Sequence, residues 1–110
     1  MDTQKEKAEK QQEQNKLEAE RMSVVALKNM FADIKSVAIE KSGFNEMTGS
    51  YPMLVKMTNT RNESVSFTYS YWPGSNKIGG WGVENSKIQV EGKTTASIKA
   101  TYSNGESEEI

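Results

Sequence analysis

The character of the chain changes near Met22, and this change constrains the fold more than any other feature. Residues 2–21 are dominated by Lys, Glu, Gln and Ala and contain no aromatic residue, glycine or proline. All nine aromatic residues, every glycine and both prolines follow Met30. A chain divided in this way predicts a charged helical arm that leads into a compact, mainly β body.

We therefore divide the chain into three parts. Residues 1–33 are predicted to form a charged helical arm, residues 34–102 a β-sandwich domain, and residues 103–110 an acidic flexible tail. The arm buries almost no apolar surface by itself, so the core must come from the middle part. A body of this size without a disulfide or a metal is usually only marginally stable. We expect a docked helix or a second subunit to support it.

Apolar residues in the arm recur at a spacing of seven, which is typical of a helix that packs along one face. The stripe residues are Leu17, Val24, Leu27, Phe31 and Ile34. Other positions of the same heptad register carry the charged residues Lys10, Glu13 and Glu20. The apolar stripe therefore covers little more than two heptads. It is too short for an independent coiled coil. We expect these last turns to dock on the body or on a neighbouring subunit.

Residues 36–41 are compatible with two structures. Val37 and Ile39 alternate with polar residues, which is typical of a strand, whereas Ser42-Gly43 would also serve to end a helix that ran on to Lys41. We favour the strand because β-branched residues are dense here and a Gly-Phe-Asn turn follows.

Farther along the chain, apolar and polar residues alternate with a period of two, which predicts strands. The clearest hairpin joins residues 53–58 to residues 65–71 through the polar turn 59–63. Two further strands are expected at residues 87–90 and 94–102. Five or six short antiparallel strands at this spacing predict a small β-sandwich, preceded by the N-terminal α-helix.

Net charge and hydropathy bear on possible partners. The net charge is -1, shared evenly between arm and body, so no basic face is available to neutralise nucleic acid or an anionic membrane surface. The longest apolar run, residues 24–27, is far shorter than a membrane span requires. We expect no nucleic-acid partner and no membrane span in this chain.

Residue types limit the chemistry further. The chain has no cysteine and no histidine, which removes thiolate nucleophiles and the commonest general base and metal ligand. Gly92-Lys93-Thr94 resembles the end of a phosphate-binding loop, but the glycine which that motif requires five residues earlier is Lys87. No Ser-x-x-Lys pair occurs, and no spacing singles out two carboxylates for acid and base roles. We predict that the protein is not an enzyme and uses no cofactor or metal.

One aromatic cluster is a candidate binding face. Tyr69 and Tyr71 continue the inward series of their strand, so we expect both in the core. Trp72 and Trp81 remain as candidate contact residues, where flat rings near three glycines would stack on a sugar or an extended peptide. The alternative is that both indoles close one end of the sandwich.

Three short stretches carry a family resemblance: Val55-Lys56-Met57-Thr58-Asn59, Glu63-Ser64-Val65-Ser66-Phe67 and Val90-Glu91-Gly92-Lys93-Thr94. In this order, over residues 34–102, the chain resembles the small immunoglobulin-like domains of bacterial extracytoplasmic and lipoprotein-type proteins, the FxLYD group among them. The Phe-x-Leu-Tyr-Asp signature itself is absent. The resemblance implies an immunoglobulin-like fold, a cell-envelope setting, roles in adhesion or complex assembly and no catalytic residue. It also implies that the arm is a tether that follows a lipid anchor or a membrane helix.

Together these features predict a non-enzymatic protein-interaction or assembly module of a bacterial cell-envelope or lipoprotein-type protein. The expected partner is another protein, or a second copy that associates through the N-terminal helix. The candidate partner-binding residues are Leu17, Val24, Leu27, Phe31, Ile34, Trp72 and Trp81. A free sheet edge is a further candidate contact.

Two alternatives remain open at this point. The first is a pilin-like filament subunit, in which a long helix to Lys41 packs on a four-stranded antiparallel sheet. The second is a carbohydrate-binding module. The expected location is extracytoplasmic, in the periplasm or on the cell surface, if a leader has been removed, and cytoplasmic if Met1 is the native start.

Overall fold

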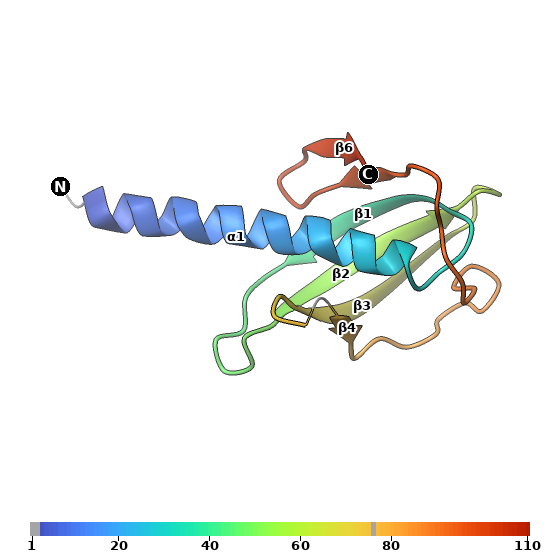
Figure 1. Ribbon diagram of the computed structural model, residues 1–110, viewed down its shortest axis with the longest axis horizontal. Helices are drawn as coiled ribbons and strands as arrows, with labels where there is room; N and C mark the ends of the chain where they lie inside the picture. Colours follow the sequence, from blue (N-terminus) through green and yellow to red (C-terminus); the bar gives the residue numbers. More distant parts are fainter. Residues whose placement is uncertain (1–2, 76) are drawn as a thin grey trace.

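The computed structural model describes residues 3–75 and 77–110. In this part of the chain one helix precedes six strands: α1 (Thr3–Lys28), β1 (Ile34–Ser42), β2 (Tyr51–Asn59), β3 (Ser64–Trp72), β4 (Lys77–Gly79), β5 (Lys99–Thr101) and β6 (Ser107–Glu109). The strands form a single sheet in the order β4-β3-β2-β1-β5-β6 (Figure 1). Neighbours are antiparallel except β1 and β5, which run parallel, so the sheet is mixed.

Helix α1 forms both the arm and one layer of the body. Its 26 residues are rich in good helix formers and span about 39 Å, and the longest extent of the molecule is 52 Å. The N-terminal half projects beyond the sheet, and the C-terminal half lies across one sheet face (Figure 1). Residues 11–15 are accordingly exposed, whereas Val24 and Leu27 are fully buried.

The chain reverses direction directly after α1. The backbone N–H groups of Met30 and Phe31 both donate to the Leu27 carbonyl oxygen, at 3.0 and 2.9 Å, which closes the last turn. Asp33 then takes a φ of 59°, a left-handed conformation that aspartate tolerates better than most residues. The helix ends at Lys28, residues 29–33 form the turn, and β1 begins at Ile34.

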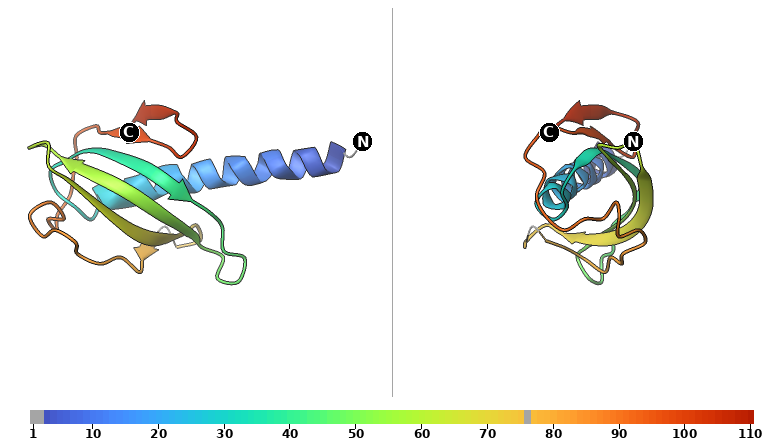
Figure 2. Two further views of the ribbon diagram at one scale, coloured as in Figure 1. Left: turned by 180° about the vertical axis from the view of Figure 1, so that it is seen from behind. Right: turned by 90° about the vertical axis from the view of Figure 1, so that its right-hand side faces the viewer.

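The sheet curls around the helix, as the end-on view in Figure 2 shows. The pairing of β1 with β2 is irregular at two places, between Ile34 and Ser36 and between Ile39 and Lys41. Irregularities of this kind bend a strand and increase its twist. Because β1 lies inside the sheet, bends in this strand contribute to the curl of the whole sheet.

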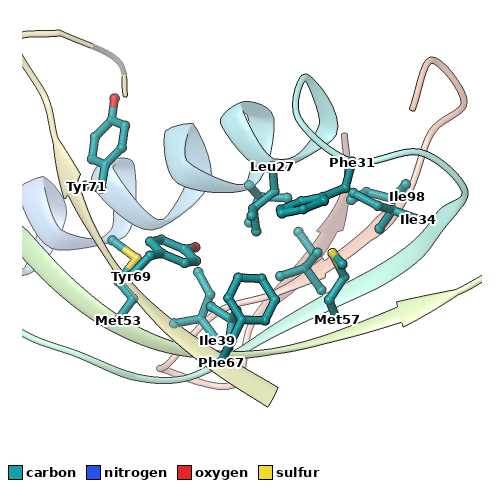
Figure 3. Close-up of a cluster of buried hydrophobic side chains, with 14 of the residues drawn as sticks. Leu27, Phe31, Ile34, Ile39, Met53, Met57, Phe67, Tyr69, Tyr71 and Ile98 are labelled. Carbon is teal, nitrogen blue, oxygen red and sulfur yellow. The ribbon is translucent and has the colours of Figure 1, made fainter. Parts of the chain in front are cut away.

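The core lies between α1 and the concave face of the sheet (Figure 3). Alternate residues of β2 and β3 point into it, namely Met53, Val55, Met57, Val65, Phe67, Tyr69 and Tyr71, all of which are buried. The ring of Phe31 meets the ring of Phe67 edge-on, with the centroids 6.1 Å apart. Burial of large apolar side chains contributes about 1.5–3 kcal/mol each, so this layer holds helix and sheet together. The inward positions expected for residues 53–58 and 65–71 are confirmed.

The predicted fold class is confirmed in outline: the protein is mainly β with one N-terminal helix. Residues 36–41 lie in β1, which confirms the strand, so the helix to Lys41 that the pilin-like alternative required is wrong. The immunoglobulin-like sandwich is not confirmed. Within residues 3–75 and 77–110 the second layer is α1 instead of a second sheet, because Val24 and Leu27 cover the concave face that a second sheet would occupy.

The later strands differ from the prediction. Residues 87–90 are not a strand; the Gln89 side chain accepts from the Glu84 and Asn85 backbone N–H groups and donates to the Gly82 carbonyl, which holds them in a loop. Residues 90–94 cross the end of α1, where Thr94 N–H donates to the Lys28 carbonyl at 2.7 Å. Of the expected strand 94–102, only β5 forms.

The segment expected to be a flexible tail instead forms a turn at residues 103–106 and strand β6 at residues 107–109. β6 pairs with β5 in antiparallel fashion, and Ile110 exchanges two backbone hydrogen bonds with Ile98, at 2.9 and 3.0 Å. The Lys28 ammonium also donates to the Ile110 carbonyl at 2.9 Å. The C-terminal hairpin is therefore tied to the end of α1.

Candidate interaction site

A groove opens where α1 leaves the sheet. It has a volume of about 490 Å³ and lies between the helix and the loop that joins β1 to β2. We call it the exit groove; it is lined by Gln12, Glu13, Asn15, Lys16, Ser42, Gly43, Phe44, Glu46 and Tyr51. The rings of Phe44 and Tyr51 form its apolar wall, with centroids 4.9 Å apart. Polar helix residues face an aromatic pair across this groove.

The β1–β2 loop is held in one shape by hydrogen bonds within it. The Asn45 side-chain oxygen accepts from the Met47 backbone N–H at 3.0 Å, and the Asn45 backbone N–H donates to the Ser50 carbonyl at 2.8 Å. Gly49 takes a φ of 68°, which the tight turn requires. The loop presents Met47 with 97% of its surface exposed and Phe44 with 55%. Two large apolar side chains thus stand in solvent on an ordered loop beside the exit groove.

A buried carboxylate fixes the helix beneath this groove. Glu20 has no exposed surface, and its carboxylate accepts hydrogen bonds from Ser42 Oγ, Ser103 Oγ and the Ser103 backbone N–H, each at 2.8 Å. Ser42 ends β1, and Ser103 begins the turn between β5 and β6. One side chain therefore joins the helix, the first strand and the C-terminal hairpin.

A second polar group lies one turn farther along α1. Ser23 Oγ donates to the Glu20 carbonyl at 2.7 Å and lies 2.9 Å from the Tyr69 hydroxyl and 3.3 Å from the sulfur of Met53. Burial raises the pKa of Tyr69 well above its ordinary value, so this phenol stays neutral. The partners of Ser23 are a carbonyl, a phenol and a thioether, and none of these is a base that would activate the hydroxyl.

The opposite side of α1 borders a more acidic groove of about 390 Å³, which includes Leu17, Glu18 and Glu106 in its lining. The Tyr102 hydroxyl donates to the Glu108 carboxylate, and the Arg21 guanidinium donates to the same carboxylate at 3.0 Å. These two hydrogen bonds lower the pKa of Glu108, the Tyr102 bond being the larger cause. The C-terminal hairpin is thus attached to α1 by this surface pair as well as by Glu20.

Of the seven predicted partner-binding residues, the five of the helical stripe are mostly buried within the chain itself. Val24, Leu27, Phe31 and Ile34 are at most 3% exposed, so the stripe docks on the body of its own chain. Leu17 is half-buried beside the acidic groove.

The two tryptophans do not form one face. Trp72 is exposed and lies on the outer sheet face against Gly79, whereas Trp81 packs inward on Phe31 with the ring centroids 5.3 Å apart. Only Trp72 remains in a position to meet a ligand, because Trp81 closes the core beside Phe31.

Sequence reasoning did not select the exit groove or Glu20 as a site. One signal for Glu20 was present: it lies seven residues before Leu27, so it occupies the stripe register on the buried side of the helix. A charge in such a position needs hydrogen-bond partners. Those partners lie far away in the sequence, in β1 and in the C-terminal hairpin, so no local pattern identifies them.

Comparison of this chain with protein-family models, with curated proteins and with solved structures found no match. The helix that the structure describes contains no stretch long and apolar enough to cross a membrane. Within residues 3–75 and 77–110, no three acidic side chains are grouped so that they would hold a metal ion. The site must therefore be interpreted from its own geometry.

Proposed function

We propose that the protein is a non-enzymatic interaction or assembly module that meets a protein partner at the exit groove. The observation that carries this proposal is Met47, almost fully exposed on a hydrogen-bonded loop beside the Phe44–Tyr51 wall. Because hydrogen bonds already order the backbone of this loop, a partner that covers Met47 and Phe44 does not have to order the loop first. Single exposed apolar residues are common on protein surfaces, but here two of them stand next to an open groove.

The non-enzymatic part of the proposal is supported by the polar groups behind the groove. Glu20 accepts from three donors and Ser23 has no base beside it, so these groups serve as fixed hydrogen-bond partners. Their effect is to hold α1 at one angle to the sheet. A screen of the pure protein against esterase, glycosidase, phosphatase and peptidase substrates should show no turnover, and any turnover abolished by Glu20→Gln would contradict this part.

The part of α1 that projects beyond the sheet supports a role as a spacer in a cell-envelope protein (Figure 1). Its residues 11–15 are all polar and exposed. Together with the resemblance to extracytoplasmic domains, this supports an envelope or lipoprotein-type setting. Fractionation of the host cell and N-terminal sequencing of the mature protein test it. Recovery of the protein in the cytoplasm with Met1 intact would contradict the setting.

Site-specific photo-cross-linking in the host cell tests the partner-binding site. A photoreactive phenylalanine analogue placed at Met47 should yield a discrete adduct with another protein. The same analogue at Lys56, an exposed position on the outer face of β2, is the matched control and should give none. No adduct from position 47, or the same adduct from both positions, would refute the site.

One observation favours carbohydrate binding as a second candidate function. Trp72 is 36% exposed on the outer sheet face, and a hollow of about 300 Å³ is lined in part by Pro52, Leu54 and Ser70, the last of which lies two residues before Trp72 on the same strand. A flat indole beside hydroxyl groups suits a sugar ring. Glycans should then quench the tryptophan fluorescence, and Trp72→Ala should abolish the response. A panel of glycans that leaves the fluorescence unchanged would exclude this candidate.

A further inference from the structure

Part of strand β3 lies at an edge of the sheet without a backbone partner. β4 has only three residues, and it pairs with residues 70–72 of β3. In the described part of the chain, no backbone hydrogen bond joins residues 64–69 to any segment other than β2. We call residues 64–69 the free edge. Every second residue of such an edge directs its N–H and C=O groups away from the sheet.

The free edge lacks the features that usually prevent edge-to-edge pairing. Natural edge strands carry charged residues, prolines or bulges, or are very short. β3 has nine residues, no charge and no proline, and its pairing with β2 is regular throughout. The opposite edge, β6, is protected in the expected way, because it has three residues and two of them are glutamates. The contrast between the two edges is that β3 carries no residue that would repel a further strand, whereas β6 does.

The pattern of β3 also specifies the strand that would fit. A strand added to the free edge should carry small polar residues on the outer face and apolar residues toward the core, with no charge. β3 itself has this pattern, with Ser64, Ser66 and Thr68 exposed and Val65 and Phe67 buried. The other long strands fit less well, because β2 contains Pro52 and Lys56 and β1 is irregular at two places.

We propose that two copies of this chain associate through antiparallel pairing of their free edges, which joins the two sheets into one continuous sheet around a two-fold axis. Residues directly opposite each other in an antiparallel pair have their side chains on the same sheet face, so the two-fold axis must pass between the two copies of either Ser66 or Phe67. In the first register the axis lies at Ser66, and Ser66 of one chain faces Ser66 of the other. In the second register the axis lies at Phe67, and Ser66 of one chain faces Thr68 of the other. Hydroxyl side chains meet on the outer face in both registers, and no like charges are brought together.

The association should be weak and concentration-dependent. About five paired residues on each chain bury much less than the ~1,600 Å² of a standard interface. A dissociation constant between about 10 μM and 1 mM is therefore expected. This inference goes beyond the proposed function, since the free edge and Met47 lie on different elements, and either one can fail without the other.

The mass of the full chain in solution tests the proposal. Sedimentation equilibrium should give the monomer mass of 12.3 kDa at low concentration and a weight-average mass about 1.5 to 1.9 times larger at a concentration of about 1 mM. The double variant Ser66→Lys/Thr68→Lys should remain monomeric, because lysines oppose each other in either register. Thr58→Lys, on the same face of the interior strand β2, is the matched control and should dimerise like the wild type. A monomer at every concentration, or equal dimerisation of the double variant, would overturn the proposal.

A cross-linking measurement reports on the pairing independently of the lysine variants. Because the chain has no cysteine, Ser66→Cys and Thr58→Cys each introduce one thiol. A short bis-maleimide should rapidly join two chains of the Ser66→Cys variant. It should not join two chains of the Thr58→Cys variant, because three strand spacings would hold their thiols about 14 Å or more apart. Equal cross-linking of the two variants would show that the copies meet elsewhere.

Discussion

Replacement of Glu20 by alanine is the perturbation that best tests how the body is held together. The carboxylate is fully buried and accepts three hydrogen bonds, two of them from Ser103 and one from Ser42. The variant removes the only side chain described here that connects α1, β1 and the C-terminal hairpin at one point. It should therefore loosen the hairpin and the angle of the helix together.

Two effects of opposite sign determine how much Glu20→Ala lowers the free energy of unfolding. Each hydrogen bond to a charged group contributes about 1.5–3 kcal/mol, so three bonds exceed the cost of burying one carboxylate that is fully hydrogen-bonded. Removal of Glu20 recovers that burial cost but leaves three donors without their acceptor. Ser42 and Ser103 are half-buried, so water satisfies part of the loss. The expected net destabilisation is about 2–3 kcal/mol.

Urea denaturation followed by circular dichroism measures this change. With a slope of about 1–1.5 kcal/mol per molar urea for a domain of this size, Glu20→Ala should lower the midpoint by about 2 M. Glu18→Ala, an exposed neighbour on the same helix, is the matched control and should change the stability by no more than about 0.5 kcal/mol.

A double-mutant cycle separates the hydrogen bonds from the burial cost. Glu20→Ala and Ser103→Ala should be coupled by about 1–2 kcal/mol, because each single variant already removes the bond from the Ser103 hydroxyl to the carboxylate. The cycle of Glu18→Ala with Ser103→Ala should be additive. If Glu20 and Ser103 are additive to within about 0.5 kcal/mol, the assignment of Glu20 as the connecting side chain is refuted.

Three further predictions concern other contacts of the body. Gly92→Ala should destabilise the protein by about 1–3 kcal/mol in urea denaturation, because a Cβ at residue 92 would lie 2.9 Å from the Cβ of Ala32; an unchanged midpoint would show that the crossing segment is not tightly packed. Leu27→Ala, at a position with no exposed surface, should cost about 2–5 kcal/mol by the same assay, and a loss below about 1 kcal/mol would contradict its place in the core. The pKa of Glu108 is lowered chiefly by the hydrogen bond from Tyr102, so the folded state holds this proton less tightly than the unfolded state. The stabilisation from Glu108 is therefore complete above its ordinary pKa of 4.5 and is lost as the pH falls below that value. The wild type should be more stable than Glu108→Gln at about pH 7 and should lose this advantage at about pH 3, whereas an advantage independent of pH would contradict the effect.

Much of the fold was predictable because it depends on local periodicity. Alternation in residues 53–58 and 65–71 predicts which side chains of β2 and β3 face the core, and these positions are buried. The spacing of Val24 and Leu27 identifies the docking face of the helix in the same way. Periodicity works here because each element buries one continuous face, and the face is encoded within the element itself.

The C-terminal part was less predictable because its structure depends on distant partners. Residues 94–102 alternate like a strand, but only β5 pairs, since residues 90–94 instead bond to the end of α1. The acidic residues 107–109 resemble a solvated tail, yet they form β6 beside β5. Backbone hydrogen bonds do not depend on side-chain polarity, so a hydrophilic segment gives no sequence signal of this pairing.

The candidate sites show the same limit. Phe44 and Met47 are recognisable as apolar residues in a loop, but their exposure beside a groove follows only from the angle at which α1 leaves the sheet. Trp72 and Trp81 share a residue type and lie close in sequence. The pleat of β3 and the turn after β4 direct one to the outer face and the other to the core.

The sequence by itself determined a polar helix, the position of its apolar stripe and the inward faces of a central hairpin, because those properties reside in residues a few positions apart. Only the tertiary structure decided that α1 takes the place of a second sheet, that Glu20 joins three elements and that β3 is left with a free edge. Each of these depends on which segments lie side by side after the chain has closed on itself, and long-range packing and hydrogen bonding select that arrangement from many that local patterns permit.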